Sequence, residues 1–263
     1  MNTVHDFISA VSIEKLSFAY GKKEPPVLLD LDLEIPSGSV SAILGPNGSG
    51  KTTLLHLILG LLTPDSGRLR VFDKDRTRYG EKGIRQVIGI VSQSETLPFG
   101  LSLFEYVLLG RAPYLPLLGT PGALDRDLAR NALETVGLWQ MAHRPVPSLS
   151  GGERQLGAVA RTLAQNPALL LLDEPTSHLD LANSRRLLRL MKRIAGEDRT
   201  VIFTTHDPNA AACAADHVIL FAKRHLVASG SPAQVLNSEL LGQTYGEHVE
   251  VVQTDRGPLV VTI

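Results

Sequence analysis

The stretch from Val40 to Leu62 constrains the fold of this chain more than any other segment. An apolar run, VSAIL, leads into the glycine-rich loop GPNGSGKT, and the loop leads to a second apolar run, LLHLILGLL. The first run is short and continuous, which is typical of a strand covered on both faces of a sheet. The second run contains Gly60 and is far shorter than a membrane span, so a buried helix is the better interpretation. The stretch therefore predicts a strand, a tight loop and a helix in succession.

Four further apolar runs have the same strand-like character. They are VIGIV, LLLL, VIFTT and VILF, which begin at Val87, Leu169, Val201 and Val218. Helical spacing of apolar residues lies between them, at Leu156, Val159, Ala160 and Leu163 and again at Leu187, Leu188, Met191 and Ile194. Because strands alternate with helices, the sequence predicts an α/β fold built on a parallel sheet.

We expect one domain with lobes over residues 1–263. Residues 11–93 would hold an antiparallel β flap and the first part of the core, and residues 94–165 a helical subdomain. Residues 166–230 would complete the core, and residues 231–263 would form a C-terminal tail. The end of that tail, HVEVVQTDRGPLVVTI, alternates around DRG and predicts a hairpin.

Composition excludes several classes of protein. A hydrophobic content of 43% over 263 residues is enough to bury a core. The net charge of −1 argues against binding nucleic acid by charge alone, so no nucleic-acid partner is expected, although a local basic patch is not excluded. The single cysteine, Cys213, rules out a disulfide within the chain. The N-terminus lacks the features of a signal peptide, so we expect any membrane role to go through a partner.

The residues from Gly45 to Thr52 fit the phosphate-loop pattern G-x-x-x-x-G-K-[ST]. The glycines would let the backbone curl until its N–H groups point at a β-phosphate. Lys51 would place a charge between the β- and γ-phosphates, and the hydroxyl of Thr52 can ligate Mg²⁺. The alternative is an ordinary glycine turn, but the strand before the loop and the helix after it favour the phosphate site.

Two carboxylates end the apolar run of LLLLDEP. Asp173 can hold the Mg²⁺ shell, and Glu174 can accept a proton from an attacking water. The alternative is an acidic helix cap or turn before Pro175. Beside a phosphate loop, the catalytic interpretation is favoured.

Two further strand ends carry polar residues. His206 ends VIFTTH at the sheet edge where ligands bind in open α/β sheets, so we favour a γ-phosphate contact over a structural hydrogen bond. Gln93 ends VIGIVSQ, where its amide can reach Mg²⁺ or the water, and the alternative there is a surface glutamine.

The segment LSGGERQ, from Leu149 to Gln155, forms a second candidate anion site. Ser150, Gly151 and Gly152 precede a helical spacing, and bare backbone N–H groups at a helix start can bind phosphate. A chain that already holds a phosphate loop has no obvious use for a second one.

With these residues placed, residues 11–235 resemble the ATPase subunits of ABC transporters. LGPNGSGKTTLL is similar to their Walker A motif, LSGGERQ to their signature, LLLLDEP to their Walker B motif and SHLD to their D-loop. His206 falls at their switch histidine, and Tyr20 where they stack an aromatic ring on adenine, although Tyr20 alone would suggest core packing. The resemblance implies a P-loop NTPase core of the RecA-like type with a β flap and a helical subdomain.

The resemblance also implies ATP hydrolysis with ATP and Mg²⁺ bound. It assigns catalysis to Lys51, Gln93, Glu174 and His206, and the metal to Thr52, Gln93 and Asp173. It assigns ATP binding to Tyr20, Gly45, Pro46, Asn47, Gly48, Ser49, Gly50, Lys51, Thr52 and Thr53. In this family two copies pack head to tail, and each would offer the other's ATP Ser150, Gly151, Gly152, Glu153 and Asp180.

The chain has one phosphate loop, no membrane span and no long coiled coil, so it resembles a stand-alone subunit that docks on separate permease subunits. That would place it on the cytoplasmic face of the inner membrane, working indirectly with an extracytoplasmic substrate-binding protein. LSLFEYVLLGRAPYLPLLG is similar to importers of iron–siderophores, haem and cobalamin, and LDLAN and FTTHDPN to their molybdate relatives. Two positions depart from the commonest patterns of the family: SQ stands at Gln93 where PQ is frequent, and Glu153 stands in the signature where glutamine is frequent.

Several alternatives stay open. One is a regulatory or repair ATPase without a permease, and another is a small-molecule kinase, which would leave LSGGERQ unexplained. The loop of residues 110–124 is apolar for a linker, at Tyr114, Leu115, Leu117 and Leu118. It would either cover its own core or form part of a pocket that receives a permease helix.

Overall fold

The computed structural model describes residues 9–93, 100–116, 118–177, 179–196, 199–246, 249–255 and 257–262. Its centre is a six-stranded sheet in the order β10-β9-β3-β8-β7-β6. The strands are β3 (Val40–Leu44), β6 (Ile88–Val91), β7 (Leu169–Leu172), β8 (Thr200–Thr205), β9 (His217–Ala222) and β10 (His225–Gly230). The first five are parallel and confirm the five strands predicted from apolar runs.

The antiparallel edge strand β10 was not predicted. It pairs with β9 through a turn in which Lys223 and Arg224 both have positive φ, 46° and 76°. Such turns usually contain Asn-Gly or Asp-Gly, and because this turn contains neither pair, the sequence did not predict a hairpin here.

The predicted antiparallel flap is confirmed and is larger than expected. It comprises β1 (Ser9–Phe18), β2 (Leu28–Pro36), β4 (Ser66–Val71) and β5 (Lys74–Asp75), in the order β2-β1-β4-β5. The tight turn between β4 and β5 again uses two residues of positive φ, Phe72 and Asp73, that do not signal a turn in sequence.

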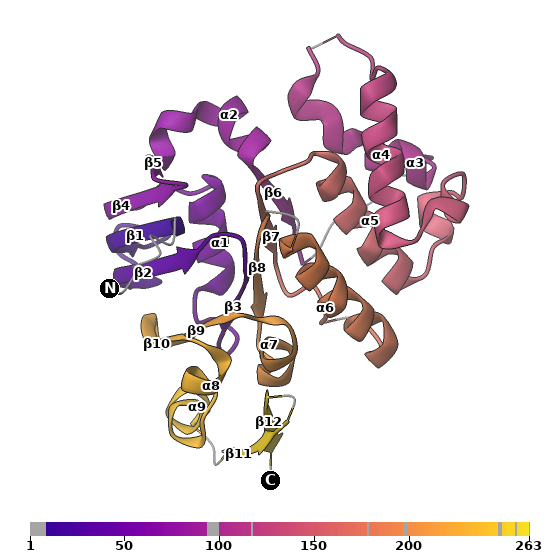
Figure 1. Cartoon of the computed structure of the whole chain (residues 1–263). Coiled ribbons are helices and arrows are strands. Elements are labelled where there is room, and N and C mark those ends of the chain that lie inside the picture. The colour runs from indigo at the N-terminus through magenta and orange to yellow at the C-terminus, as the bar shows by residue number, and fades with distance from the viewer. Residues whose placement is uncertain are drawn as a thin grey trace, which may run out of the picture.

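The central sheet has a different cover on each face (Figure 1). On one face, Ile43 and Leu171 pack with the flap and with α1 (Lys51–Leu59), which ends at Gly60. On the other, Ala42 and Leu172 pack with α5 (Gly151–Ala164), α6 (Leu181–Ala195) and α7 (Pro208–Ala214). Burial on both faces explains why the strands are continuously apolar. The connection from the flap strand β5 to β6 contains η1 (Arg76–Tyr79) and α2 (Gly80–Val87).

A lobe of helices projects beyond the sheet (Figure 1). It contains α3 (Leu103–Leu108), η2 (Leu109–Tyr114), α4 (Ala123–Val136) and α5, with the short turns η3 (Trp139–Met141) and η4 (Val146–Ser148). Together with the sheet and flap, this arrangement confirms the predicted fold class. No helix in the described part of the chain is long and apolar enough to cross a membrane.

The C-terminal tail consists of α8 (Pro232–Val235), α9 (Ser238–Tyr245), β11 (Val249–Thr254) and β12 (Gly257–Thr262). The last two form the predicted hairpin. Leu236, Leu241, Val249 and Val260 are buried in the same core as α7. The tail is therefore packed onto the sheet domain as part of its core.

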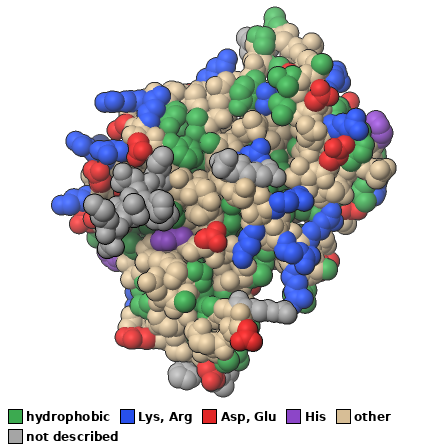
Figure 2. Space-filling model, viewed as in Figure 1, with side chains coloured by type: hydrophobic (Ala, Val, Ile, Leu, Met, Phe, Trp, Pro, Cys, Tyr) green, Lys and Arg blue, Asp and Glu red, His purple; other side chains and the backbone are tan. Residues whose placement is uncertain are grey.

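The positive and negative side chains nearly cancel in number but are unevenly distributed over the surface. Figure 2 shows Lys and Arg side chains gathered over the region of α6. The exposed cations of that helix are Arg185, Arg186, Arg189, Lys192 and Arg193. Arg186 donates a hydrogen bond to the carbonyl of Val136 at 2.7 Å, so part of this charge lies at the C-terminal end of α4, where cations are favourable.

Candidate ATPase site

The glycine-rich loop joins β3 to α1 at the carboxyl ends of the parallel strands. Gly48 and Gly50 have φ of 77° and 103°, which other residues rarely adopt. A Cβ at Gly45 would lie 2.3 Å from the carbonyl oxygen of Phe221. The loop conformation therefore requires the glycines that the sequence pattern supplies.

Lys51 is buried, and its ammonium is held in place within the loop. Its Nζ donates to the carbonyls of Gly45 at 2.9 Å and Pro46 at 3.1 Å, and lies 3.5 Å from Oε1 of Glu174. Burial lowers the pKa of Lys51, and the negative charge of Glu174 opposes that shift. The result is a fixed and poorly solvated cation, which suits the binding of a polyanion.

Two observations test whether the loop fits a phosphate and a metal ion. The hydroxyl of Ser49 is buried and has no hydrogen-bond partner among the described residues, as expected of a group that completes its contacts with a ligand. Oγ1 of Thr52 lies 2.9 and 3.1 Å from the carboxylate oxygens of Asp173. A hydroxyl beside a carboxylate is a hard oxygen pair that suits Mg²⁺.

The two acidic residues that follow β7 share one hydrogen-bond partner on β8. Thr204 donates to Oδ1 of Asp173 at 2.6 Å and accepts from the backbone N–H of Glu174 at 2.8 Å. Glu174 has a φ of 44°, a left-handed conformation that non-glycine residues adopt only when their surroundings impose it. Thr204 was missed in the sequence, although the pair TT before His206 places it next to a strand end.

Glu174 and His206 are brought into contact. Nδ1 of His206 lies 3.2 Å from Oε2 of Glu174, while the other carboxylate oxygen faces Lys51. The side chain of Glu174 is 11% exposed, and that of His206 is 51% exposed. One carboxylate therefore joins a buried cation to a ring that remains open to solvent.

A pocket of about 460 Å³ opens over the loop. Among its lining residues are Tyr20, Asn47, Lys51, Gln93 and Glu174. The hydroxyl of Tyr20 lies 3.0 Å from Oγ1 of Thr53, and the residue is 58% exposed. Tyr20 is therefore not a core residue, and its ring is available to a ligand at the mouth of the pocket.

The signature residues start α5, as predicted. The backbone N–H of Ser150 donates to Oε2 of Glu153 at 2.7 Å, and the N–H of Glu153 donates to Oγ of Ser150 at 3.3 Å. Glutamate and glutamine can both make this reciprocal cap, and the negative charge of Glu153 is in addition favourable at a helix N-terminus. Asp180 caps α6 with its side chain alone, accepting from the N–H of Asn183 at 2.8 Å. None of Ser150, Glu153 or Asp180 lines the pocket over the loop.

A glycine-rich loop after a buried strand, with carboxylates at the end of the neighbouring strand, defines the P-loop class of nucleoside triphosphatases. Residues 28–177 match the family model described as ABC transporter. The chain belongs to the ABC transporter family. ATP binding follows from that membership, and the protein is an ATPase coupled to transport. The resemblance drawn from the motifs is confirmed, and the family explains LSGGERQ, which the kinase alternative did not.

Relatives of known role match nearly the whole chain. The ferric enterobactin transport ATP-binding protein FepC of Escherichia coli (strain K12) is 35% identical over 253 residues, 95% of this chain and 93% of the relative. The molybdate import ATP-binding protein MolC of Haemophilus influenzae is 38% identical, over 88% of this chain and 86% of the relative. A putative metal-chelate type ABC transporter in an inward-facing conformation is 34% identical, with a TM-score of 0.84 over 97% of both chains.

Proposed function

We propose that this chain is the ATP-hydrolysing subunit of an importer for a metal chelate or metal oxyanion. The observation that carries the proposal is the contact of Glu174 with both Lys51 and His206 beside the phosphate loop. In this role Glu174 accepts the proton of the attacking water, and His206 contacts the γ-phosphate. Lys51 and the loop N–H groups from Gly45 to Thr53 hold the phosphates, and Tyr20 supports the adenine.

Mg²⁺ would be held by Thr52, Asp173 and Gln93, and when bound it neutralises charge on the phosphate oxygens. Gln93 lines the same pocket, two residues after the end of β6. Its position supports a second role, in which it links the site to the helical lobe.

We propose that the site is completed by a second copy of the chain. The signature residues Ser150 to Glu153 do not line the pocket over the loop of their own chain, and neither does Asp180. Ser150 to Glu153 form the N-terminus of α5. A helix N-terminus contributed by the partner would supply the missing donors and exclude water from the γ-phosphate.

The test of the two-copy site uses Glu174→Gln, which keeps the shape of the site but removes the base. With ATP and Mg²⁺ this variant should sediment as a stable dimer. Gly151→Asp is the matched variant, because no atom lies within 4 Å of an added Cβ and the new carboxylate would face the partner's phosphates. The double variant should stay monomeric. A Glu174→Gln protein that never dimerises with ATP contradicts the two-copy site.

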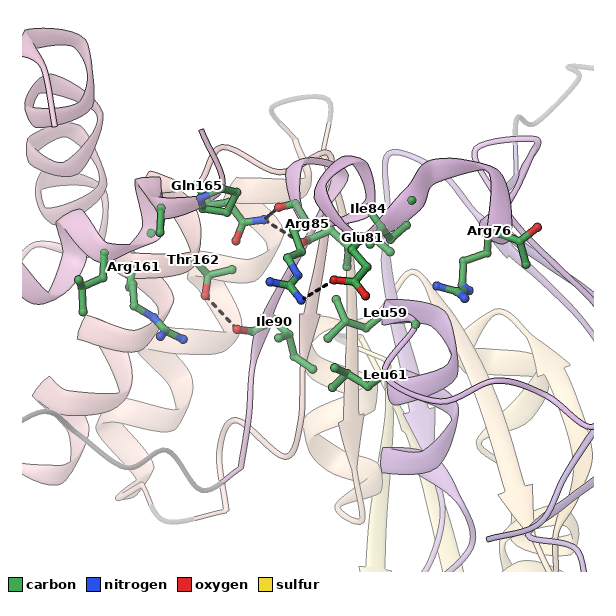
Figure 3. Close-up of a pocket in the computed structure, with 18 residues that line it drawn as sticks. Leu59, Leu61, Arg76, Glu81, Ile84, Arg85, Ile90, Arg161, Thr162 and Gln165 are labelled. Carbon is green, nitrogen blue, oxygen red and sulfur yellow. Dashed lines mark hydrogen bonds and ion pairs between the residues drawn. The ribbon is translucent and has the colours of Figure 1, made fainter. Parts of the chain in front are cut away.

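A groove of about 810 Å³ supports docking on a permease (Figure 3). It lies between the core, at the end of α1 and along α2, and the helical lobe, at η2 and α5. Its apolar lining includes Leu59, Leu61, Ile84, Ile90 and Leu109, and its cations include Arg76, Arg85 and Arg161. Because Ile90 lies on β6, which leads directly to Gln93, we propose that a permease helix with apolar and acidic residues docks here.

The loop of residues 110–124 borders this groove through Ala112 and Pro113. Leu118 is 97% exposed and covers no core, whereas Tyr114 packs against the guanidinium of Arg111 at 4.0 Å. Leu117 lies outside the described residues. The exposure of Leu118 supports a docking role for this loop over a covering role.

Docking is tested by Leu61→Ser with Leu109→Ser, and separately by Leu117→Ser with Leu118→Ser. Both pairs should lower the amount of chain that co-purifies with a polytopic protein from native membranes, while ATP hydrolysis by the isolated chain is unchanged. Leu29→Ser, on the exposed side of the flap, is the control. If neither pair of substitutions lowered co-purification, the proposed docking of a permease helix in the groove would be contradicted.

The cargo class rests on the relatives, which include transport proteins for ferric enterobactin, hemin and molybdate. We propose that the chain acts at the cytoplasmic face of the inner membrane, and that an extracytoplasmic protein delivers the cargo to the permease. Isolation of the intact complex and mass spectrometry of its bound solute would identify the cargo. A bound solute that contains no metal would contradict the proposed class.

A further inference from the structure

The C-terminal tail contacts the segment that carries His206. The hydroxyl of Tyr245, the last residue of α9, donates to the backbone carbonyl of His206 at 3.1 Å. Burial raises the pKa of Tyr245, and the nearby Asp207 raises it further. The phenol therefore stays protonated, and it remains a hydrogen-bond donor at every pH at which the protein works.

A second contact lies three residues after His206. The side chain of Asn209 makes two hydrogen bonds with Val260 of β12: Nδ2 donates to the carbonyl at 3.0 Å, and Oδ1 accepts from the N–H at 2.9 Å. Both polar ends of this amide are therefore used on the hairpin. The backbone N–H of Asn209 also donates to Oδ1 of Asp207 at 2.8 Å, which fixes the start of α7.

Apolar packing makes the tail a firm support for these contacts. Leu241 of α9 and Val260 of β12 are buried, and so are Ala211 and Ala214 of α7. All four belong to one core cluster, and Figure 1 shows the hairpin next to α7. Movement of the tail would therefore disturb the helix that directly follows His206.

The His206 ring has far weaker support of its own. It is half exposed, and its Nδ1 contacts the carboxylate of Glu174 at 3.2 Å. We infer that Tyr245 and Asn209 are positioning residues, which hold the backbone of His206 so that its ring faces Glu174 and the nucleotide. This inference rests on the proposed role of His206 in hydrolysis.

Tyr245→Phe in the full chain tests the inference, because it removes the donor and keeps the ring. We expect kcat to fall about three- to tenfold, the change that loss of one hydrogen bond allows, with KM for ATP within about twofold of wild type. In the nucleotide-free protein, amide hydrogen exchange should become faster over residues 203–212. Tyr79→Phe is the control: it removes a 2.8 Å bond to the carbonyl of Val71 in the flap, and should change neither measurement.

Asn209→Asp provides a second variant of nearly unchanged shape, in which a carboxylate oxygen faces the Val260 carbonyl. It should change kcat and exchange in the same direction as Tyr245→Phe. A double-mutant cycle then separates positioning from general stability. In a His206→Ala background, Tyr245→Phe should have no further effect on the residual rate of phosphate release.

The outcomes distinguish the two proposals. A slow His206→Ala enzyme combined with a Tyr245→Phe enzyme of wild-type kcat and exchange would overturn this inference alone. An equal loss from Tyr245→Phe with and without His206 would overturn it too. A His206→Ala enzyme with wild-type kcat would contradict the proposed role of His206, and the inference with it.

Discussion

Thr204 is bonded to both acidic residues of the site, and its replacement by valine tests how the site is built. The side chain is fully buried on β8, where it donates to Asp173 at 2.6 Å and accepts from the N–H of Glu174 at 2.8 Å. Valine has nearly the same shape but makes neither bond. The change leaves the partly buried N–H of Glu174 without a partner and releases Glu174 from its positive-φ conformation.

The magnitude follows from the two lost bonds. Loss of a bond to a charged group and of the partner of a partly buried N–H together cost about 2–4 kcal/mol of unfolding free energy. For a chain of this length the loss lowers Tm by roughly 4–16 °C. The catalytic effect comes from misplacement of Glu174, and small misplacements can lower rates about 100-fold. We therefore expect kcat to fall by roughly 10- to 100-fold.

The assay combines thermal unfolding with steady-state phosphate release at saturating ATP and Mg²⁺. Thr200→Val is the control on the same strand, because Thr200 is buried but accepts a 3.0 Å bond from the N–H of Gly38, away from the site. It should lose about 1 kcal/mol of stability and keep its kcat. If Thr204→Val and Thr200→Val had equal kcat, Thr204 would be a packing residue only and the reasoning would be refuted.

Three further predictions concern packing, pH and metal. Gly110→Ala should destabilise the protein by about 1–3 kcal/mol in chemical denaturation, because its Cβ would lie 2.0 Å from the carbonyl oxygen of Arg161. The pKa of Glu153 is lowered mainly by its hydrogen bond from the backbone of Ser150, then by the bond with the Ser150 side chain and by the charge of Arg144. The stabilising contribution of Glu153 is therefore present above its ordinary pKa of 4.5 and is lost as pH falls through the lowered pKa. The stability difference between wild type and Glu153→Gln should therefore shrink in acid, and denaturation midpoints that kept a constant difference would contradict it. Chelation of Mg²⁺ should abolish phosphate release but not all binding of a fluorescent ATP analogue, and metal-independent release would refute the proposed metal site.

The core strands and the nucleotide loop were predictable because their signals are local. Eight consecutive residues, Gly45 to Thr52, specify the loop, and strands buried on both faces are continuously apolar wherever they occur. The strands β10, β4 and β5 were not predictable. Their turns place Lys223, Arg224 and Phe72, which have no turn preference, at positive φ beside Asp73, and neither turn contains the Asn-Gly or Asp-Gly pair that signals a tight hairpin.

The sequence by itself determined the class of the protein, the two acids after β7 and the histidine after β8, since each follows a recognisable strand. The tertiary structure alone decided what supports them. Thr204 reaches Asp173 across 31 residues, and Tyr245 reaches His206 across 39. Such contacts have no periodic signal, because they depend on which strand neighbours which in the sheet and on where the tail packs. Those arrangements are set by burial of the whole core, and no short segment encodes them.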